Sequence, residues 1–327
     1  MGSKALRSFG GIVLIASMAG CLGGTLPPGC PPNCMGANLR GRELTGFDLR
    51  GANLSRAVLQ NAQLRGQNLT GADLSATNLV GANLMRANLS NARLVGATLQ
   101  GANMTAVLLH GADLSGADLS GATLTRVNLT QVNLTAVIMN NVRLIGATLS
   151  EVNLSGAQLV GGNLAGASLV RANLSGANLG QKNQRERGTN LNGADLRLAN
   201  LTGANLTRAR LRGAKLRQAQ LDDASVEAAE LWGVDLTQAQ LRRARLSEAI
   251  LSGAILDRAI LVGADLSQAH LNGTILYAAD LSDAVLVHVT EQGVTHIDLY
   301  GARYTPQTRW PETFQPPPVA VFEEAAE

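Results

Sequence analysis

Residues 52–74 read ANLSR-AVLQN-AQLRG-QNLTG-ADL, so that an apolar residue returns at every fifth position. The same column runs in one register from Leu39 to Leu179, which is 29 repeats, and again from Leu191 to Leu286, which is 20. Of these 49 positions 46 are Leu, and the other three are Met or Val. A period of five matches neither the 3.6 of a helix nor the 2 of a long strand. The chain must therefore turn once per repeat.

The positions around each Leu have preferences of their own. Ala dominates two positions before it and Asn or Asp directly before it, as in Ala72-Asp73-Leu74, while Gly is frequent two positions after it, as at Gly71. Residues two apart in an extended segment share a face, so Ala and Leu can both point inward while the residue between them points outward. Gly provides backbone freedom for the turn. Each repeat is thus expected to form one short side of a coil.

The pattern of Ala, then Asn or Asp, then Leu and two variable residues resembles the pentapeptide-repeat family, and the resemblance covers residues 37 to about 304. It implies an all-β fold, a right-handed quadrilateral β-helix with four repeats per coil. With 49 repeats this would give about twelve coils. In some members of the family, loops that leave the coil carry the contacts to a specific partner.

The charged residues provide a separate test of four repeats per coil, because side chains 20 residues apart would then be neighbours in successive coils. At this spacing nine pairs of charges are opposite and one is alike, and the opposite pairs include Asp73 with Arg93 and Asp195 with Lys215. At a spacing of 15 the count is seven to four, and at 25 it is six to four. A spacing of 20 fits best, and the pairs are expected to favour register more than stability.

The amino terminus has the features of a bacterial targeting segment. Residues 1–20 run from a basic start with Lys4 and Arg7 into an apolar stretch at 12–16, and small residues then precede Cys21. This arrangement resembles a lipoprotein signal peptide, after which Cys21 would be the first residue and carry a lipid. An ordinary cleaved secretory signal and an uncleaved apolar start are the alternatives. The lipid predicts a membrane-anchored protein of the bacterial cell envelope, at the outer membrane or the periplasmic face.

Residues 21–36 form a Pro-rich and Cys-rich tether that contains Cys30 and Cys34. In an oxidising compartment these two thiols are expected to form a disulfide beside the first coil. The alternatives are free thiols and a metal site. Two thiolates with no nearby His or further Cys do not complete a tetrahedral metal site, so no metal is predicted.

The repeat is interrupted once in its middle and again near its end. Run one covers residues 37–180 and run two 191–304, and the polar segment 181–190 between them makes the spacing of the Leu column 12 residues where 10 would keep the register. This segment is either a tolerated surface insertion or an interaction loop, whose candidate contacts are Lys182, Arg185 and Arg187. The register breaks again between Leu286 and Leu299.

The last segment, residues 305–327, is expected to cap the rod, because an uncovered coil would expose strand edges. Tyr304, Trp310 and Phe314 are the side chains available to cover the last coil. The tail after Pro316 is expected to be loose.

Composition and motifs together predict a protein without catalysis. Without Lys4 and Arg7 the chain has 25 cationic and 24 acidic residues, which gives little support to nucleic-acid binding. No catalytic residue and no cofactor site are predicted. The leading hypothesis is an envelope lipoprotein whose rod is a structural or protein-interaction scaffold, with a protein partner that the sequence leaves unnamed and an oligomeric state that it leaves open. The alternative is a DNA-mimicking, topoisomerase-binding pentapeptide-repeat protein, which would need an acidic stripe that residues such as Arg208 and Arg212 interrupt.

Overall fold

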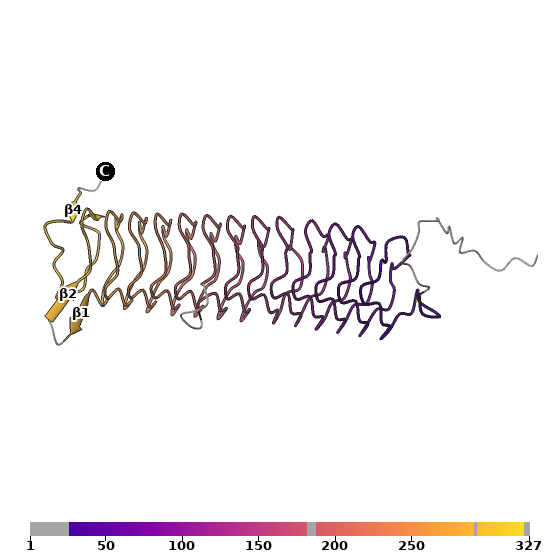
Figure 1. Ribbon diagram of the computed structural model, residues 1–327. Coiled ribbons are helices and arrows are strands. Elements are labelled where there is room, and N and C mark those ends of the chain that lie inside the picture. Colours follow the sequence, from indigo (N-terminus) through magenta and orange to yellow (C-terminus); the bar gives the residue numbers. More distant parts are fainter. Residues whose placement is uncertain (1–25, 182–187, 291–292, 324–327) are drawn as a thin grey trace, which may run out of the picture.

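The protein is a rod of coils stacked along one axis, from the first repeats at one end to the cap at the other (Figure 1). The computed structural model describes residues 26–181, 188–290 and 293–323. These ranges contain no helix, and their strands are β1 (Val287–Thr290), β2 (Gly293–His296), β3 (Arg303–Tyr304) and β4 (Val321–Phe322). Elsewhere the coils are joined by parallel bridges between single residues.

Bridges between residues 20 apart join neighbouring coils, such as those from Asn53 to Asp73 and from Asp73 to Arg93. Four five-residue repeats therefore complete one coil, and the predicted quadrilateral β-helix is confirmed. The number of coils and the right-handed sense stay predictions. We number the four faces by the first outward residue on each, which are Asn33 (face 1), Asn38 (face 2), Glu43 (face 3) and Asp48 (face 4).

The Leu and Ala columns fill the interior of the rod. Ala52 and Leu54 are both completely buried, and so are nearly all their equivalents in the other repeats. The Leu54 N–H donates to the carbonyl of Asp73 in the next coil (2.7 Å), and the Asp73 N–H donates back to Ala52 (2.9 Å). Each coil is thus bound through its backbone to the coil before it and the coil after it.

The residue two positions after each Leu adopts a left-handed backbone conformation, with φ of 59° at Gly51 and 57° at Arg56. Gly has no Cβ and takes this conformation without strain. Twenty-four residues other than Gly are nevertheless held in it. The coil therefore imposes the turn even where the side chain disfavours it.

The Asn or Asp before each Leu has a defined role in the turn. The backbone N–H directly after the Leu has no backbone acceptor, and the preceding side chain accepts from it instead, as Asn53 Oδ1 does from the Ser55 N–H (3.1 Å). Where Gln158 stands in the Asn position, Asn140 of the preceding coil accepts from the Val160 N–H (3.1 Å). Because short carboxamide and carboxylate groups satisfy this donor, the fold selects them at that position.

The middle interruption is an insertion of seven residues into one coil. The bridge from Asn163 to Asn190 joins residues 27 apart, where 20 is the rule. The ladder continues through Gln181, whose N–H donates to Thr207 (3.0 Å), and resumes at Thr189. The segment between them, 182–188, therefore replaces nothing in the ladder. The spacing of 12 along the Leu column is five residues of repeat plus these seven, in place of ten plus two.

The second interruption lengthens a coil to 28 residues, as the bridge from His270 to Asp298 shows. It forms the antiparallel β1–β2 hairpin, which the sequence did not predict. Both insertions follow a Leu of face 2, namely Leu179 and Leu286. Both consequently leave the rod at the corner between faces 2 and 3.

Candidate functional site

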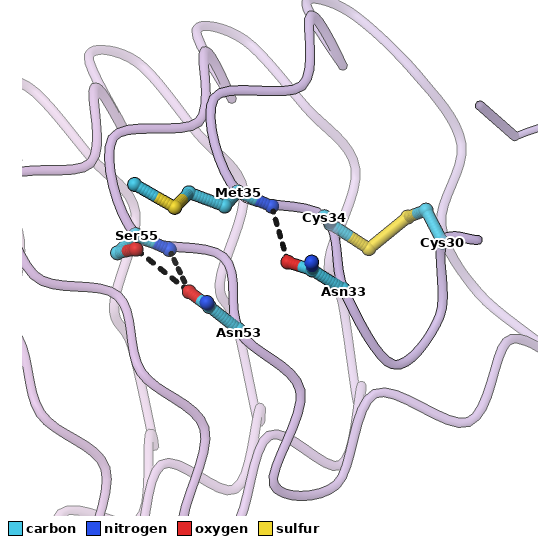
Figure 2. Close-up of a disulfide and its surroundings, with 6 residues drawn as sticks. All are labelled: Cys30, Asn33, Cys34, Met35, Asn53 and Ser55. Atoms are coloured by element: carbon cyan, nitrogen blue, oxygen red, sulfur yellow. Dashed lines mark hydrogen bonds between the residues drawn. A yellow bond between two sulfur atoms is a disulfide. The ribbon is translucent and has the colours of Figure 1, made fainter. Parts of the chain in front are cut away.

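A disulfide between Cys30 and Cys34 closes the first described turn of the chain (Figure 2). The Cys34 side chain is 1% exposed and continues the Leu column one repeat before Leu39. Its N–H donates to the carbonyl of Asn53 in the next coil (2.7 Å). The two thiols are thus paired in the structure, with one sulfur in the core. Cys21, the expected lipid site, lies outside the described residues.

Figure 2 also shows that the turn contact of the repeat is already present beside the disulfide. Asn33 accepts from the Met35 N–H (3.3 Å) as Asn53 does from Ser55 one coil later. The first regular repeat therefore begins at the disulfide itself.

Aromatic side chains close the other end of the rod. Tyr304 meets Trp310 edge to face with ring centroids 5.6 Å apart, and Trp310 lies 5.4 Å from Phe314. These three residues, which the sequence analysis selected, are partly buried against the core. Phe322 of β4 also contacts Tyr304, at 5.6 Å. The Trp310 Nε1 atom is buried without a hydrogen-bond partner among the described residues.

The tail after Pro316 is ordered onto the rod, so the expectation of a loose tail was wrong. Strand β4 pairs in parallel with β3, in the place of one more coil. Glu323 then accepts hydrogen bonds from the Tyr277 hydroxyl and from Arg303 Nε (2.6 Å for the latter). The bond from Tyr277, and next that from Arg303, lower the pKa of Glu323, and the same contact raises the pKa of Tyr277. The apolar run at 319–322 was the available sequence signal for this strand.

The loop residues Lys182, Arg185 and Arg187 lie outside the described residues, but the base of their insertion is well defined. A Cβ on Gly188 would lie 2.2 Å from the backbone oxygen of Arg208, so only Gly fits there. The buried Thr189 hydroxyl donates to the carbonyl of Leu159 (2.7 Å). The insertion is therefore anchored to the coils on both sides of it.

The predicted charge ladders form only in part. All nine opposite pairs involve side chains in adjacent coils, but in the described part of the chain three close to an ion pair within 4.0 Å: Glu151–Arg171 (3.4 Å), Asp222–Arg242 (3.6 Å) and Asp223–Arg243 (2.7 Å). Other charges pair within their own turn, as Arg197 does with Asp195 (2.7 Å). That hydrogen bond from Arg197 holds the pKa of Asp195 below its usual value.

Charge is also banded along the rod. Residues 196–221 contain six cations and no acid, and residues 222–241 contain five acids and no cation. A cationic coil therefore lies directly beside an acidic one.

The described residues offer little that resembles a catalytic centre. A pocket of about 510 Å³ lies between the last turn of face 2 and the cap, and its lining from Ala284–Val287, Ile297 and Pro311–Pro317 includes no acid or base. Over the described ranges, no group of three or more His, Cys, Asp or Glu could hold a metal ion. In the same ranges no helix is long and apolar enough to cross a membrane.

Coils of four short repeats around a Leu core define the chain as a quadrilateral β-helix, a solenoid with four flat outer faces. The chain belongs to the pentapeptide-repeat family, whose sequence model for pentapeptide repeats matches residues 33–66, 68–105, 102–141, 112–150, 128–164, 147–181, 187–218, 219–258 and 249–287. Pentapeptide-repeat proteins are generally non-enzymatic scaffolds. No curated protein matches the chain significantly.

Several solved structures are similar to this chain. HetL, a pentapeptide repeat protein involved in heterocyst differentiation regulation in the cyanobacterium Nostoc, is 31% identical over 79% of this chain and 91% of its own, with a TM-score of 0.34. A pentapeptide repeat protein of the Arabidopsis thaliana thylakoid lumen is 26% identical over 44% of this chain and 68% of its own (TM-score 0.12). A trypsin-treated variant of QnrB1, a plasmid-mediated fluoroquinolone resistance protein, is 16% identical over 63% and 91% (TM-score 0.27).

Proposed function

We propose that this protein is a non-enzymatic lipoprotein of the bacterial cell envelope, in which the repeat rod is a structural or protein-interaction scaffold. The Cys30–Cys34 disulfide is the observation that carries the location. Structural disulfides persist in oxidising compartments such as the periplasm and are rare in the cytosol. The disulfide lies shortly after a segment that resembles a lipoprotein signal, so the leader and the first coil favour the same compartment.

The proposed architecture has a lipid on Cys21, a short tether over residues 21–36, and a rod that extends away from it. With about twelve coils at the spacing of β-strands, the rod would be roughly 60 Å long. Short polar side chains cover its faces, and the pocket beside the cap has no acid or base to support chemistry. These features support a role in which a rigid surface holds or spaces another protein. The near balance of charges favours a protein partner over a nucleic acid.

Metabolic labelling with a palmitate analogue tests the anchor. The wild-type chain should take up label and the Cys21→Ala variant should not, while Cys30→Ala is the matched control that loses a different cysteine and should stay labelled. Fractionation combined with surface protease treatment then assigns the membrane and the side. Label that persists in Cys21→Ala, or a wild-type chain that stays in the cytosol, would overturn the proposal. Inhibition of gyrase supercoiling by the purified chain would favour the topoisomerase-binding alternative instead.

A further inference from the structure

Face 3 carries its charges in an order that reverses along the rod. Three successive bridges lead from Arg143 through two Asn residues to Arg210. The next bridge joins Arg210 to Glu230, and three more lead from Glu230 to Asp298. Cations thus occupy both ends of the first half of this column, and carboxylates occupy both ends of the second half. The midpoint lies between the coils of Arg210 and Glu230.

The corner between faces 3 and 4 has a related arrangement about the same midpoint. Arg212 stands on one side and Trp232 on the other, in consecutive coils, with the guanidinium carbon 5.8 Å from the indole ring. Ile145 lies three coils before Arg212, and Tyr300 lies three coils after Trp232. The exposed fractions of Ile145, Trp232 and Tyr300 are 37%, 42% and 70%. Large exposed side chains of this kind are typical of interaction sites.

A second copy of the chain matches this strip when it is turned end for end. A twofold axis that crosses the rod at the midpoint, in the plane of contact, reverses the order of coils and keeps each column opposite itself. Arg210 then faces the second copy's Glu230, and Arg143 faces its Asp298. Along the corner, Arg212 faces the other Trp232. Symmetry makes each of these contacts twice.

The corner also supplies an apolar contact under the same operation, because Ile145 faces the second copy's Tyr300. Asn192 and Ser252, which lie one coil either side of the central pair, bring two polar side chains together. No two like charges meet along the two columns. Opposite charge, aromatic–cation and apolar contacts therefore all coincide under one symmetry operation.

The four charged groups are available for such contacts. Across the described ranges none of Arg143, Arg210, Glu230 and Asp298 forms an ion pair within 4.0 Å. Arg210 and Glu230 stay unpaired even though they are bridged neighbours. Both insertions leave the rod at the corner between faces 2 and 3, at the opposite edge of face 3 from this corner column.

We propose that two copies of this protein associate side by side and antiparallel through face 3 and the corner between faces 3 and 4. The strip spans eight coils, which is about 34 Å at β-strand spacing. It is only two columns wide, so the area is small and the dimer is expected to be weak and reversible. Because its charged contacts lie at the surface, high salt should weaken it. This association goes beyond the proposed scaffold role and does not depend on the lipid.

Sedimentation equilibrium of the full chain over a concentration series tests the proposal. The wild type should show a monomer–dimer equilibrium that shifts toward monomer in high salt. An acidic variant with Arg143→Glu and Arg210→Glu, and a basic variant with Glu230→Arg and Asp298→Arg, should each dimerise at least about tenfold more weakly. An equimolar mixture of the two variants should form a one-to-one dimer, because each then offers the charge that the other lacks.

A double reversal at an internal ion pair is the matched control. Asp223→Arg with Arg243→Asp changes as many charges per face and keeps their pairing within the chain, so it should dimerise as the wild type does. Circular dichroism of all variants shows whether the rod is folded, and each substituted side chain points outward. A wild type that remains monomeric throughout would overturn the proposal. So would a dimer that survives in both swapped variants, or variants that fail to associate when mixed although both are folded.

Discussion

Removal of the Cys30–Cys34 cross-link should loosen the first coils and leave the middle of the rod intact. The disulfide closes a loop across a sequence separation of four residues, which by loop-closure entropy stabilises the cross-linked segment by about 2 kcal/mol. Cys30→Ser removes the cross-link and keeps the buried Cys34 sulfur in the Leu column, so the change separates the cross-link from core packing. Because each coil is bonded only to its neighbours, the loss should be local.

Native-state hydrogen exchange measures this effect one coil at a time. The Leu39 N–H donates to Val58 in the next coil (2.8 Å) and reports on the first coil, and the Leu201 N–H, which donates to Gln220 (2.6 Å), reports on the middle. In Cys30→Ser the exchange of the Leu39 amide should accelerate by about 30-fold, while that of Leu201 should not change. Reduction of the wild type should give the same result. Equal acceleration at both amides, or none at either, would refute the reasoning that the end coils open independently.

Three further outcomes are expected. Leu109→Ala, at a 1% exposed core position, should lower the free energy of unfolding by about 2–5 kcal/mol, whereas Leu108→Ala, next to it but 57% exposed, should change it by less than about 0.5 kcal/mol in denaturant titrations. Gly188→Ala should cost about 3 kcal/mol because its Cβ meets backbone, and Gly193→Ala, where nothing lies within 4 Å and only φ of 64° opposes a side chain, about 1 kcal/mol; equal costs would contradict the steric account. Since the folded pKa of Glu323 is lowered, its hold on the tail should be complete above pH 4.5 and be lost as the pH falls further, so the β4 amides should lose exchange protection in acid, and Glu323→Gln should remove that dependence.

Much of the fold could be predicted from the sequence because the repeat repeats its own evidence. A Leu in every fifth position has no helical or simple strand solution, and charge pairs at a spacing of 20 indicated the length of the coil before any coordinates. The role of Asn53 as acceptor for the turn N–H was less accessible, since it depends on which backbone donors the ladder leaves over. The length of the middle insertion was misjudged for a similar reason. Only the bridge from Asn163 to Asn190 shows where the ladder resumes.

The ends of the rod were less predictable than its middle. Tyr304, Trp310 and Phe314 could be selected as cap residues because aromatic side chains are rare in this chain. The return of β4 to the rod could not, since its partners Tyr277 and Arg303 lie far from Glu323 in the sequence. A contact between distant segments leaves no periodic signal.

The sequence by itself determined the coil: the inward Leu and Ala, the turn in every repeat, and the 20-residue period follow from spacing that any five-residue repeat must obey. Tertiary structure alone decided what the surface of the rod presents. Stacking brings Arg210 beside Glu230 and Arg212 beside Trp232, places both insertions at one corner, and sets the Cys34 sulfur in the core. The reason is that a repeat specifies how each coil is built, whereas the neighbours of an outward side chain depend on the accumulated register of every coil and insertion before it.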